Sequence, residues 1–156
     1  EMIRLKQEVN APTAGAMGYG IPAAVAAALR FPERCVVAVA GDGDFLMNAQ
    51  ELATAVQYGC NLLVLVIDNG SYGTIRMHQE RTYPGRVAAT DLANPDFAAL
   101  GAAFGAWTRR VDTTDAFAQA LAEAKERGGL RLLHCVVEIE QLSAGGATVS
   151  GLRSGS

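Results

Sequence analysis

The chain has 156 residues, of which 50% are hydrophobic and 19% are charged, and its formal net charge is −3. This length fits one domain, so we expect residues 1–156 to form a single unit. The apolar content is sufficient for a buried core and is not typical of a disordered chain. The acidic balance, without a cluster of Lys and Arg, argues against nucleic acid or an anionic membrane as the main partner. No apolar run reaches the roughly 18–20 residues that a membrane span requires.

The ends of the chain and its cysteines favour a reduced, cytoplasmic setting. Residues 1–10 are charged and lack the apolar centre of a signal peptide. The cysteines Cys35, Cys60 and Cys135 stand singly. Cys35 and Cys135 lie in apolar runs, which predicts that they are small buried hydrophobes rather than redox pairs. We expect poorly ordered ends over residues 1–12 and 143–156.

The first half of the chain predicts two helices and two strands. An alanine-rich helix is expected over Pro22–Arg30, and a continuous apolar strand over Cys35–Ala40. Asn48 and Glu51 have the spacing of a capping box, which predicts a helix capped by Asn48. A second continuous apolar strand is expected over Leu62–Ile67.

The second half repeats the alternation of helices and strands. Asn94 is predicted to cap a helix that has Pro95 at its first position. Three further elements follow: a weaker strand over Ala106–Val111, a helix opened by Thr113 or Thr114, and a last strand over Leu132–Ile139.

This alternation predicts an α/β fold, namely a doubly wound, mostly parallel sheet with helices on both faces. In such sheets, ligands bind beyond the carboxyl ends of the strands. The two loops that follow Ala40 and Ile67 are therefore the places where we expect chemistry. Their sequences are Gly41-Asp42-Gly43-Asp44 and Asp68-Asn69-Gly70-Ser71-Tyr72-Gly73.

These two loops carry the ligands that a magnesium diphosphate requires. Mg²⁺ prefers oxygen ligands, which Asp42 can supply as a carboxylate, Asn69 as an amide and Ser71 as a backbone carbonyl. Gly41 and Gly43 allow a close approach of the backbone. The amides of Gly43 and Asp44 are expected to face phosphate near a helix start, where the helix dipole favours anions.

Gly41-Asp42-Gly43, a spacer of 25 residues (44–68) and then Asn69 resembles the cofactor motif of the acetolactate synthase and pyruvate decarboxylase superfamily, whose members use thiamine diphosphate. The resemblance extends from about Ala14 to Ile139. One departure is Asp68, where the family often has a second Asn. The resemblance implies thiamine diphosphate and Mg²⁺ as cofactors and a small 2-oxo acid as substrate.

A second block, Gly15–Ala24, is similar to the family segment that holds the middle of the cofactor. By this match, Met17 is the apolar wedge that bends the cofactor, and the Gly15 carbonyl accepts a hydrogen bond from its 4′-amino group. The implied cofactor-binding residues are Gly18, Gly41, Gly43, Asp44, Tyr72, Gly73, Thr74 and Ile75. The alternative of a dinucleotide fingerprint in this block is rejected, because the glycine order is wrong and no strand precedes it.

The family's pyrimidine-binding domain, with its glutamate, has no counterpart in this sequence. The resemblance therefore implies an incomplete active site, a partner domain from the same or another subunit, homo-oligomeric assembly, and no turnover by the chain alone. The alternative is a non-catalytic assembly or regulatory module that keeps the fold. A pyrimidine-binding domain encoded upstream or by a neighbouring gene would favour the enzyme.

Other polar residues have more than one interpretation. His134 lies in an apolar run and is expected to be structural. His78 corresponds to a substrate-pocket tryptophan of the acetolactate synthases, but a solvent-facing helical residue is an equal alternative. Asp68, Asp91 and Asp112 are interpreted as turn or cap residues rather than catalytic ones.

Overall fold

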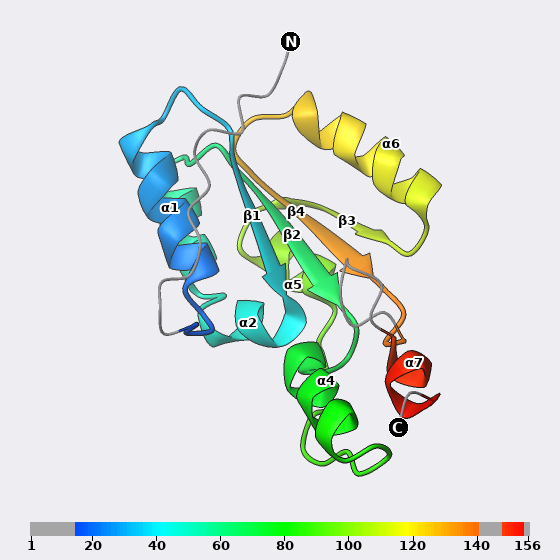
Figure 1. Ribbon diagram of the computed structural model, residues 1–156. Helices are drawn as coiled ribbons and strands as arrows, with labels where there is room; N and C mark the ends of the chain where they lie inside the picture. The colour runs from blue at the N-terminus through cyan, green and yellow to red at the C-terminus, as the bar shows by residue number, and fades with distance from the viewer. Residues whose placement is uncertain (1–14, 141–147, 155–156) are drawn as a thin grey trace.

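A computed structural model describes residues 15–140 and 148–154. Its centre is a sheet of four parallel strands in the order β1-β2-β4-β3 (Figure 1). The strands are β1 (Val36–Gly41), β2 (Leu62–Asp68), β3 (Trp107–Val111) and β4 (Leu130–Val136). The doubly wound α/β prediction is confirmed.

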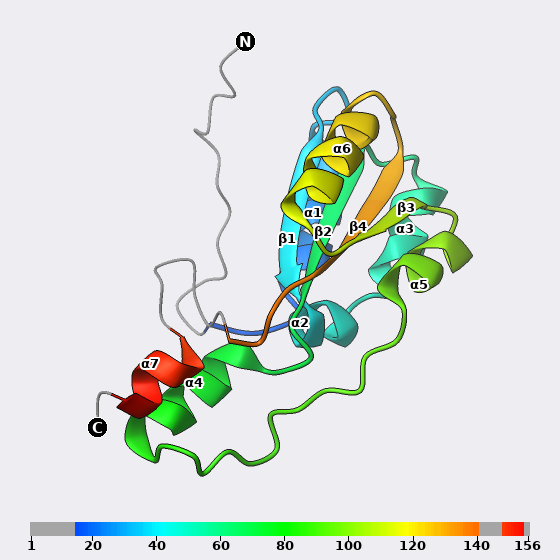
Figure 2. The same cartoon turned by 90° about the vertical axis from the view of Figure 1, so that its right-hand side faces the viewer.

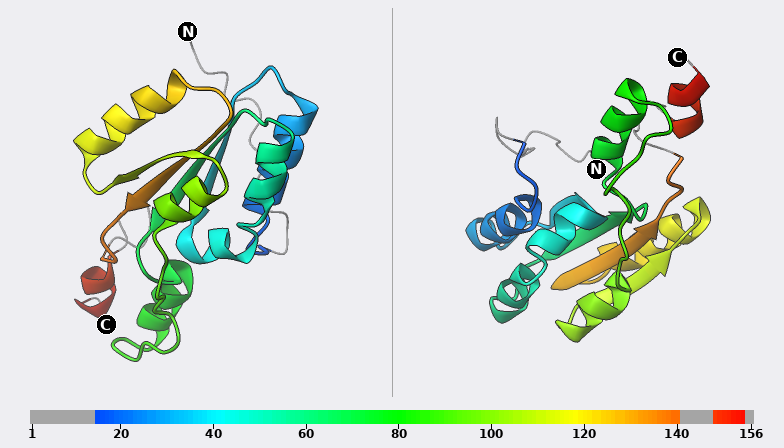
Figure 3. Two further views of the ribbon diagram at one scale, coloured as in Figure 1. Left: turned by 180° about the vertical axis from the view of Figure 1, so that it is seen from behind. Right: turned by 90° about the horizontal axis from the view of Figure 1, so that it is seen from below.

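Helices cover both faces of this sheet. They are α1 (Gly20–Arg30), α2 (Asp42–Met47), α3 (Glu51–Gln57), α4 (Gly73–Thr82), α5 (Phe97–Ala103), α6 (Thr114–Lys125) and α7 (Val149–Ser154). Figure 2 shows α6 on one face and α1, α3 and α5 on the other, and Figure 3 shows the second face from behind. Helices α4 and α7 lie beyond the carboxyl ends of the strands. No helix among the described residues is both long and apolar enough to cross a bilayer.

Each face of the sheet has its own apolar core. On the larger side, residues of α1, α3 and α5 pack against alternate residues of β1, β2 and β4, with Phe45, Leu52 and Phe97 fully buried. On the other side, Ala120 and Ala124 of α6 pack against β2, β3 and β4. Burial on both faces explains the continuous apolar runs of β2 and β4, whereas β1 is buried on one face and leaves Val37 and Val39 exposed on the other.

Two predicted helix caps are wrong. The helix after β1 begins at Asp42, and Asn48 ends it, while α3 begins at Glu51 without a side-chain cap. Likewise Asp96, not Asn94, caps α5 by accepting a hydrogen bond from Ala99 N at 3.0 Å. Both asparagines instead make contacts with residues distant in the sequence. The cap by Thr113 is confirmed, since its hydroxyl accepts from Ala116 N at 3.2 Å.

Three smaller expectations also differ from the structure. Strand β4 ends at Val136, so residues 137–139 are not part of it. Cys35 is exposed because it precedes β1, whereas Cys135 is buried as expected. Of the tails expected at 1–12 and 143–156, the first lies outside the described residues, and the second contains α7.

Helix α7 is held against α4 by a buried carboxylate. The side chain of Glu80 in α4 is fully buried. Arg153 of α7 donates two hydrogen bonds to it, from Nε at 3.1 Å and from Nη2 at 2.7 Å, and Gly85 N donates a third at 2.8 Å. The hydrogen bonds from Arg153 hold the pKa of the Glu80 carboxyl below its ordinary value of 4.5. Paired, charge-assisted hydrogen bonds of this kind fix geometry strongly.

We expect Glu80→Gln to lower the melting temperature at pH 7, because a neutral amide replaces the charge-assisted hydrogen bonds from Arg153 with weaker ones. A carboxyl with a lowered pKa stabilises the fold above its unfolded-state pKa and loses that contribution as the pH falls through its folded-state pKa. The difference between wild type and variant should therefore shrink below pH 4.5. Glu123→Gln, which removes an exposed pair with Arg109, is the control and should change little. A difference that stays constant in acid would contradict the charge-based explanation.

Candidate functional site

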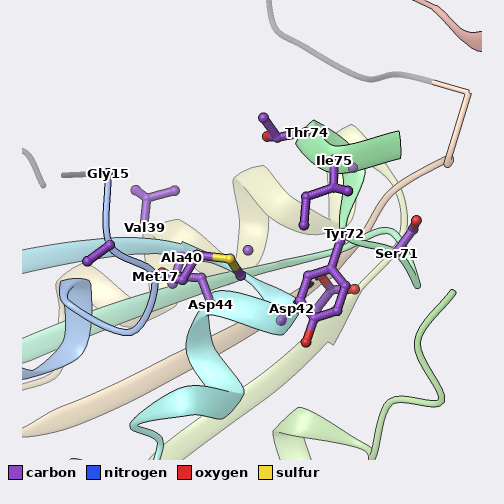
Figure 4. Close-up of a pocket in the computed structure, with 14 residues that line it drawn as sticks. Gly15, Met17, Val39, Ala40, Asp42, Asp44, Ser71, Tyr72, Thr74 and Ile75 are labelled. Atoms are coloured by element: carbon purple, nitrogen blue, oxygen red, sulfur yellow. Dashed lines mark hydrogen bonds between the residues drawn. The ribbon is translucent and has the colours of Figure 1, made fainter. Parts of the chain in front are cut away.

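A cavity of about 480 Å³ lies beyond the carboxyl end of β1 (Figure 4). Three segments line it: Gly15–Met17, Val39–Asp44 and Ser71–Ile75. Figure 4 shows the side chains of Met17, Tyr72 and Ile75 directed toward the same space. The two loops selected from the sequence and the Gly15 block therefore meet at one place, where ligands of such sheets bind.

Asp42 is the buried acidic group of this cavity. It follows β1 directly, and only 3% of the residue is exposed. Its Oδ1 accepts a hydrogen bond from Gly43 N at 2.8 Å, and its Oδ2 accepts one from the Asn94 amide at 2.7 Å. Burial raises the pKa of the Asp42 carboxyl. Because both donors are neutral, a cation bound here would stabilise the ionised form.

Asp68 lies beside Asp42, because the parallel register pairs Gly41 with Ile67, the residues that precede them. Its Oδ1 accepts from Asn94 at 2.8 Å and from Gly70 N at 3.0 Å, and its Oδ2 lies 2.8 Å from His134 Nε2. Burial alone would raise the pKa of Asp68, but the hydrogen bonds from His134 and Asn94 lower it below its ordinary value. The turn role expected for Asp68 is present, but it is only part of its function.

Sequence reasoning missed Asn94 as part of the site. It was assigned to a helix cap, whereas its amide joins the two carboxylates at the ends of β1 and β2. A usable signal was present: an aspartate stands at or directly after the end of each of two adjacent strands, and a donor between two such carboxylates is favourable. Nothing local in the sequence indicates which residue supplies that donor.

The second expected metal ligand, Asn69, lies in a tight turn. Its Oδ1 accepts from Ser71 N at 3.0 Å. Asn69 is not among the described residues that line the cavity, whereas Ser71 is. The Ser71 carbonyl accepts from Gly73 N at 2.8 Å, and its hydroxyl donates to Thr90 O at 2.9 Å. A carbonyl oxygen has a second lone pair, so Ser71 O retains capacity for a metal. The three-ligand metal site stays a prediction.

Gly43 allows the two loops to touch. A Cβ at this position would lie 2.3 Å from Cε1 of the Tyr72 ring, closer than any side chain tolerates. A Cβ on Gly73 would similarly meet Asn69 Nδ2 at 2.8 Å. Gly43 is therefore required for contact between the two strand-end loops, and Gly73 for the tight turn within the second one. By contrast, a Cβ on Gly41 would meet nothing within 4 Å.

The Gly18 peptide is held on both sides by the segment that follows β1. Its N–H donates to Asp44 Oδ1 at 2.6 Å, and its carbonyl accepts from Asn48 Nδ2 at 2.7 Å. The side chain of Asp44, and not only its amide, thus contributes to the site. Since Gly18 follows Met17, these two hydrogen bonds fix the position of the expected wedge, which is 40% exposed at the cavity.

Helix α4 begins at the rim of the cavity. Thr74 and Ile75 in its first turn line the cavity and are exposed. His78 lies one turn further along α4 and is also exposed. It does not belong to the described cavity lining, so its two interpretations stay open.

Comparison with known proteins agrees with this geometry. The family described as thiamine pyrophosphate enzyme, C-terminal TPP binding domain, matches residues 2–135. The acetolactate synthase large subunit of Haemophilus influenzae is 39% identical over 117 residues, which cover 74% of this chain and 20% of that protein. The Escherichia coli acetolactate synthase isozyme 2 large subunit is 38% identical over 129 residues, which cover 82% of this chain and 23% of that protein. The crystal structure of benzoylformate decarboxylase from Polynucleobacter necessarius has a TM-score of 0.76 and 31% identity over 81% of this chain and 25% of its own.

The chain belongs to the thiamine pyrophosphate enzymes. It contains the C-terminal cofactor-binding domain of an acetolactate synthase-like member, and thiamine pyrophosphate is another name for thiamine diphosphate. The resemblance found in the sequence is thereby confirmed. The chain spans about a fifth to a quarter of the length of these relatives.

The residues of this thiamine pyrophosphate-binding domain fit a magnesium diphosphate chemically. Asp42 is a buried carboxylate without a charged donor, and Ser71 presents a carbonyl in the same cavity. The glycine at position 43 has no room for a side chain, which keeps the backbone at the cavity surface. Oxygen donors of this kind are those that Mg²⁺ prefers.

We expect Gly18→Ala to destabilise the thiamine pyrophosphate-binding domain more than Gly59→Ala does. Both glycines have positive φ, +82° and +62°, so each alanine costs about 1–2 kcal/mol of backbone strain. Only at Gly18 would the added Cβ also meet Asn48 Nδ2 at 2.8 Å and Met47 Cβ at 2.9 Å. Denaturant unfolding of both variants measures the two losses. Equal losses would show that the loop moves to accommodate the added Cβ, so that Gly18 is not closely packed against α2.

Proposed function

We propose that this domain binds thiamine diphosphate through Mg²⁺ in an acetolactate synthase-like enzyme that decarboxylates a 2-oxo acid, joins it to an acceptor, or does both. The observation that carries the proposal is the buried Asp42 carboxylate in the cavity that Met17 and Ile75 also line. The names of the relatives, acetolactate synthase and benzoylformate decarboxylase, support this class of reaction.

Asp42, Asn69 and the Ser71 carbonyl would hold the metal. Asp42 and Ser71 both line the cavity. The Asn69 side chain lies in the adjoining turn, where it accepts a hydrogen bond from Ser71 N. Rotation of the Asn69 amide toward the cavity would complete the set of oxygen ligands. The backbone amide of Asp44, in the first turn of α2, would then face the diphosphate.

Met17 and Gly15 would position the rings of the cofactor. Thiamine diphosphate supplies a nucleophilic carbon and an electron sink for the carbon dioxide that leaves a 2-oxo acid. The Met17 side chain lies in the cavity, and its backbone is fixed through Gly18. Gly18, Gly41, Gly43, Tyr72, Gly73, Thr74 and Ile75 would contact the remainder of the cofactor or the substrate.

This domain needs a second domain to complete the active site. Met17, Val39 and Ile75 line the cavity and are 40%, 64% and 47% exposed, which leaves an apolar opening for another protein surface. We propose that a pyrimidine-binding domain from the same or another subunit of a homo-oligomer covers this opening. Alone, the domain would bind the cofactor weakly and would not turn over.

Asp42→Ala in the natural protein is expected to abolish magnesium-dependent binding of thiamine diphosphate, because the buried carboxylate is the one charged metal ligand proposed. Titration calorimetry with and without Mg²⁺ measures this component. Asp112→Ala, which removes an exposed carboxylate paired with Arg110, is the control and should bind as wild type does. Unchanged binding by Asp42→Ala would refute the metal assignment.

Met17→Ala is expected to slow proton exchange at C2 of the bound cofactor more than it weakens cofactor affinity, because a wedge acts on ring geometry. Proton exchange followed by NMR and calorimetry on the same samples separate the two effects. Leu29→Ala removes an exposed apolar side chain outside the cavity and serves as control. Equal exchange rates in Met17→Ala and wild type would remove the wedge role.

A further inference from the structure

We propose that Asn94 is the positioning residue of the magnesium site: it holds the Asp42 carboxylate in the orientation that binds the cation. The inference rests on the proposed function, since it takes Asp42 as a metal ligand. Asn94 lies in the segment before α5 and does not line the cavity among the described residues, so it acts through Asp42 and not on the cofactor.

Asn94 bridges two neighbouring carboxylates. The register of β1 and β2 brings Asp42 and Asp68 side by side at one edge of the sheet. Asn94 Nδ2 has two hydrogens, and its two acceptors are Asp42 Oδ2 at 2.7 Å and Asp68 Oδ1 at 2.8 Å. One neutral amide therefore donates one hydrogen bond to each of the two carboxylates.

The Asn94 amide is oriented with its nitrogen toward the two acids. Asn94 Oδ1 is buried and has no hydrogen-bond partner within the described residues. Rotating the amide by 180° would place this oxygen against two carboxylate oxygens, so the bridging orientation is the stable one despite the unpaired oxygen. An unpaired buried carbonyl is costly, which indicates that the contacts to the two acids outweigh it.

The segment that contains Asn94 is itself anchored to the core. Two residues later, Asp96 caps α5, and Phe97 is fully buried. The ring of Phe97 meets that of His134 edge to face, with centroids 5.1 Å apart, and His134 contacts the other oxygen of Asp68. The apolar core and the bridge therefore fix each other's positions.

The consequence for Asp42 is a fully oriented carboxylate. Gly43 N holds one oxygen and Asn94 the other, and each oxygen keeps a further lone pair for a cation. Without Asn94, the Asp42 side chain would turn away from Asp68, because the two acids would face each other without a donor between them. Mutation of a residue that orients a metal ligand typically lowers metal affinity roughly 10–100-fold.

The test uses the natural protein and measures Mg²⁺ affinity in the presence of thiamine diphosphate by calorimetry, with thermal melting of each variant alongside. Asn94→Leu keeps the volume but removes the donors, and should weaken Mg²⁺ binding roughly 10–100-fold. Thr113→Ala removes the side-chain cap of α6, which lies on the other face of the sheet, and is the control: its melting temperature should fall while Mg²⁺ affinity stays unchanged. If Asn94→Leu does not fold, Asn94→Ser, which keeps one donor, should show a smaller loss of affinity in the same direction.

A rescue separates positioning from a structural role. Adding Asp68→Asn to Asn94→Leu removes the second charge and supplies an amide beside Asp42, so it should restore part of the Mg²⁺ affinity. Wild-type affinity in Asn94→Leu, or a loss of affinity that Asp68→Asn does not rescue, would overturn the inference. If Asp42→Ala also leaves Mg²⁺ binding unchanged, the metal assignment fails and the inference fails with it. Loss in Asp42→Ala with none in Asn94→Leu refutes the inference alone.

Discussion

The parallel pairing of β1 with β2 is the constraint on which the site depends. Its register places Gly41 opposite Ile67, so the residues that follow, Asp42 and Asp68, leave the sheet at the same edge. The core on one face of β1 fixes this register, because a slip of one residue would move Ala38 and Ala40 out of that core. The energy of the core is thus what brings two acids together at the cofactor cavity.

Close approach of the loops depends on the same edge. Tyr72 can lie against the backbone of Gly43 only because both loops leave neighbouring strands and one of them has no side chain there. The Gly18 peptide is then held between Asp44 and Asn48, on either end of α2. The expected wedge, the diphosphate loop and the rim are therefore fixed to one another through α2, not through separate supports.

The sequence predicted the elements better than it predicted the hydrogen bonds. Continuous apolar runs identified β1 and β2 and located both functional loops, although only β2 is buried on both faces. Asn48 and Asn94 were assigned to caps, since the cap pattern is local. In the structure their amides bind residues 30 and 52 positions away, a pairing that depends on the tertiary fold. A local cap pattern cannot show that a residue distant in the sequence will bind the same side chain.

The arrangement of acids implies a balance between stability and function. Burial raises the pKa of Asp42, so the domain spends free energy on ionising it when no cation is bound. The hydrogen bond from Asn94 to Asp42 reduces this cost but brings no positive charge to the carboxylate. A lysine or arginine at that place would stabilise the apo fold and would also repel a divalent cation. A neutral amide between the acids keeps the carboxylate oriented while leaving its charge for the ligand, so binding of a cation stabilises the fold by mass action.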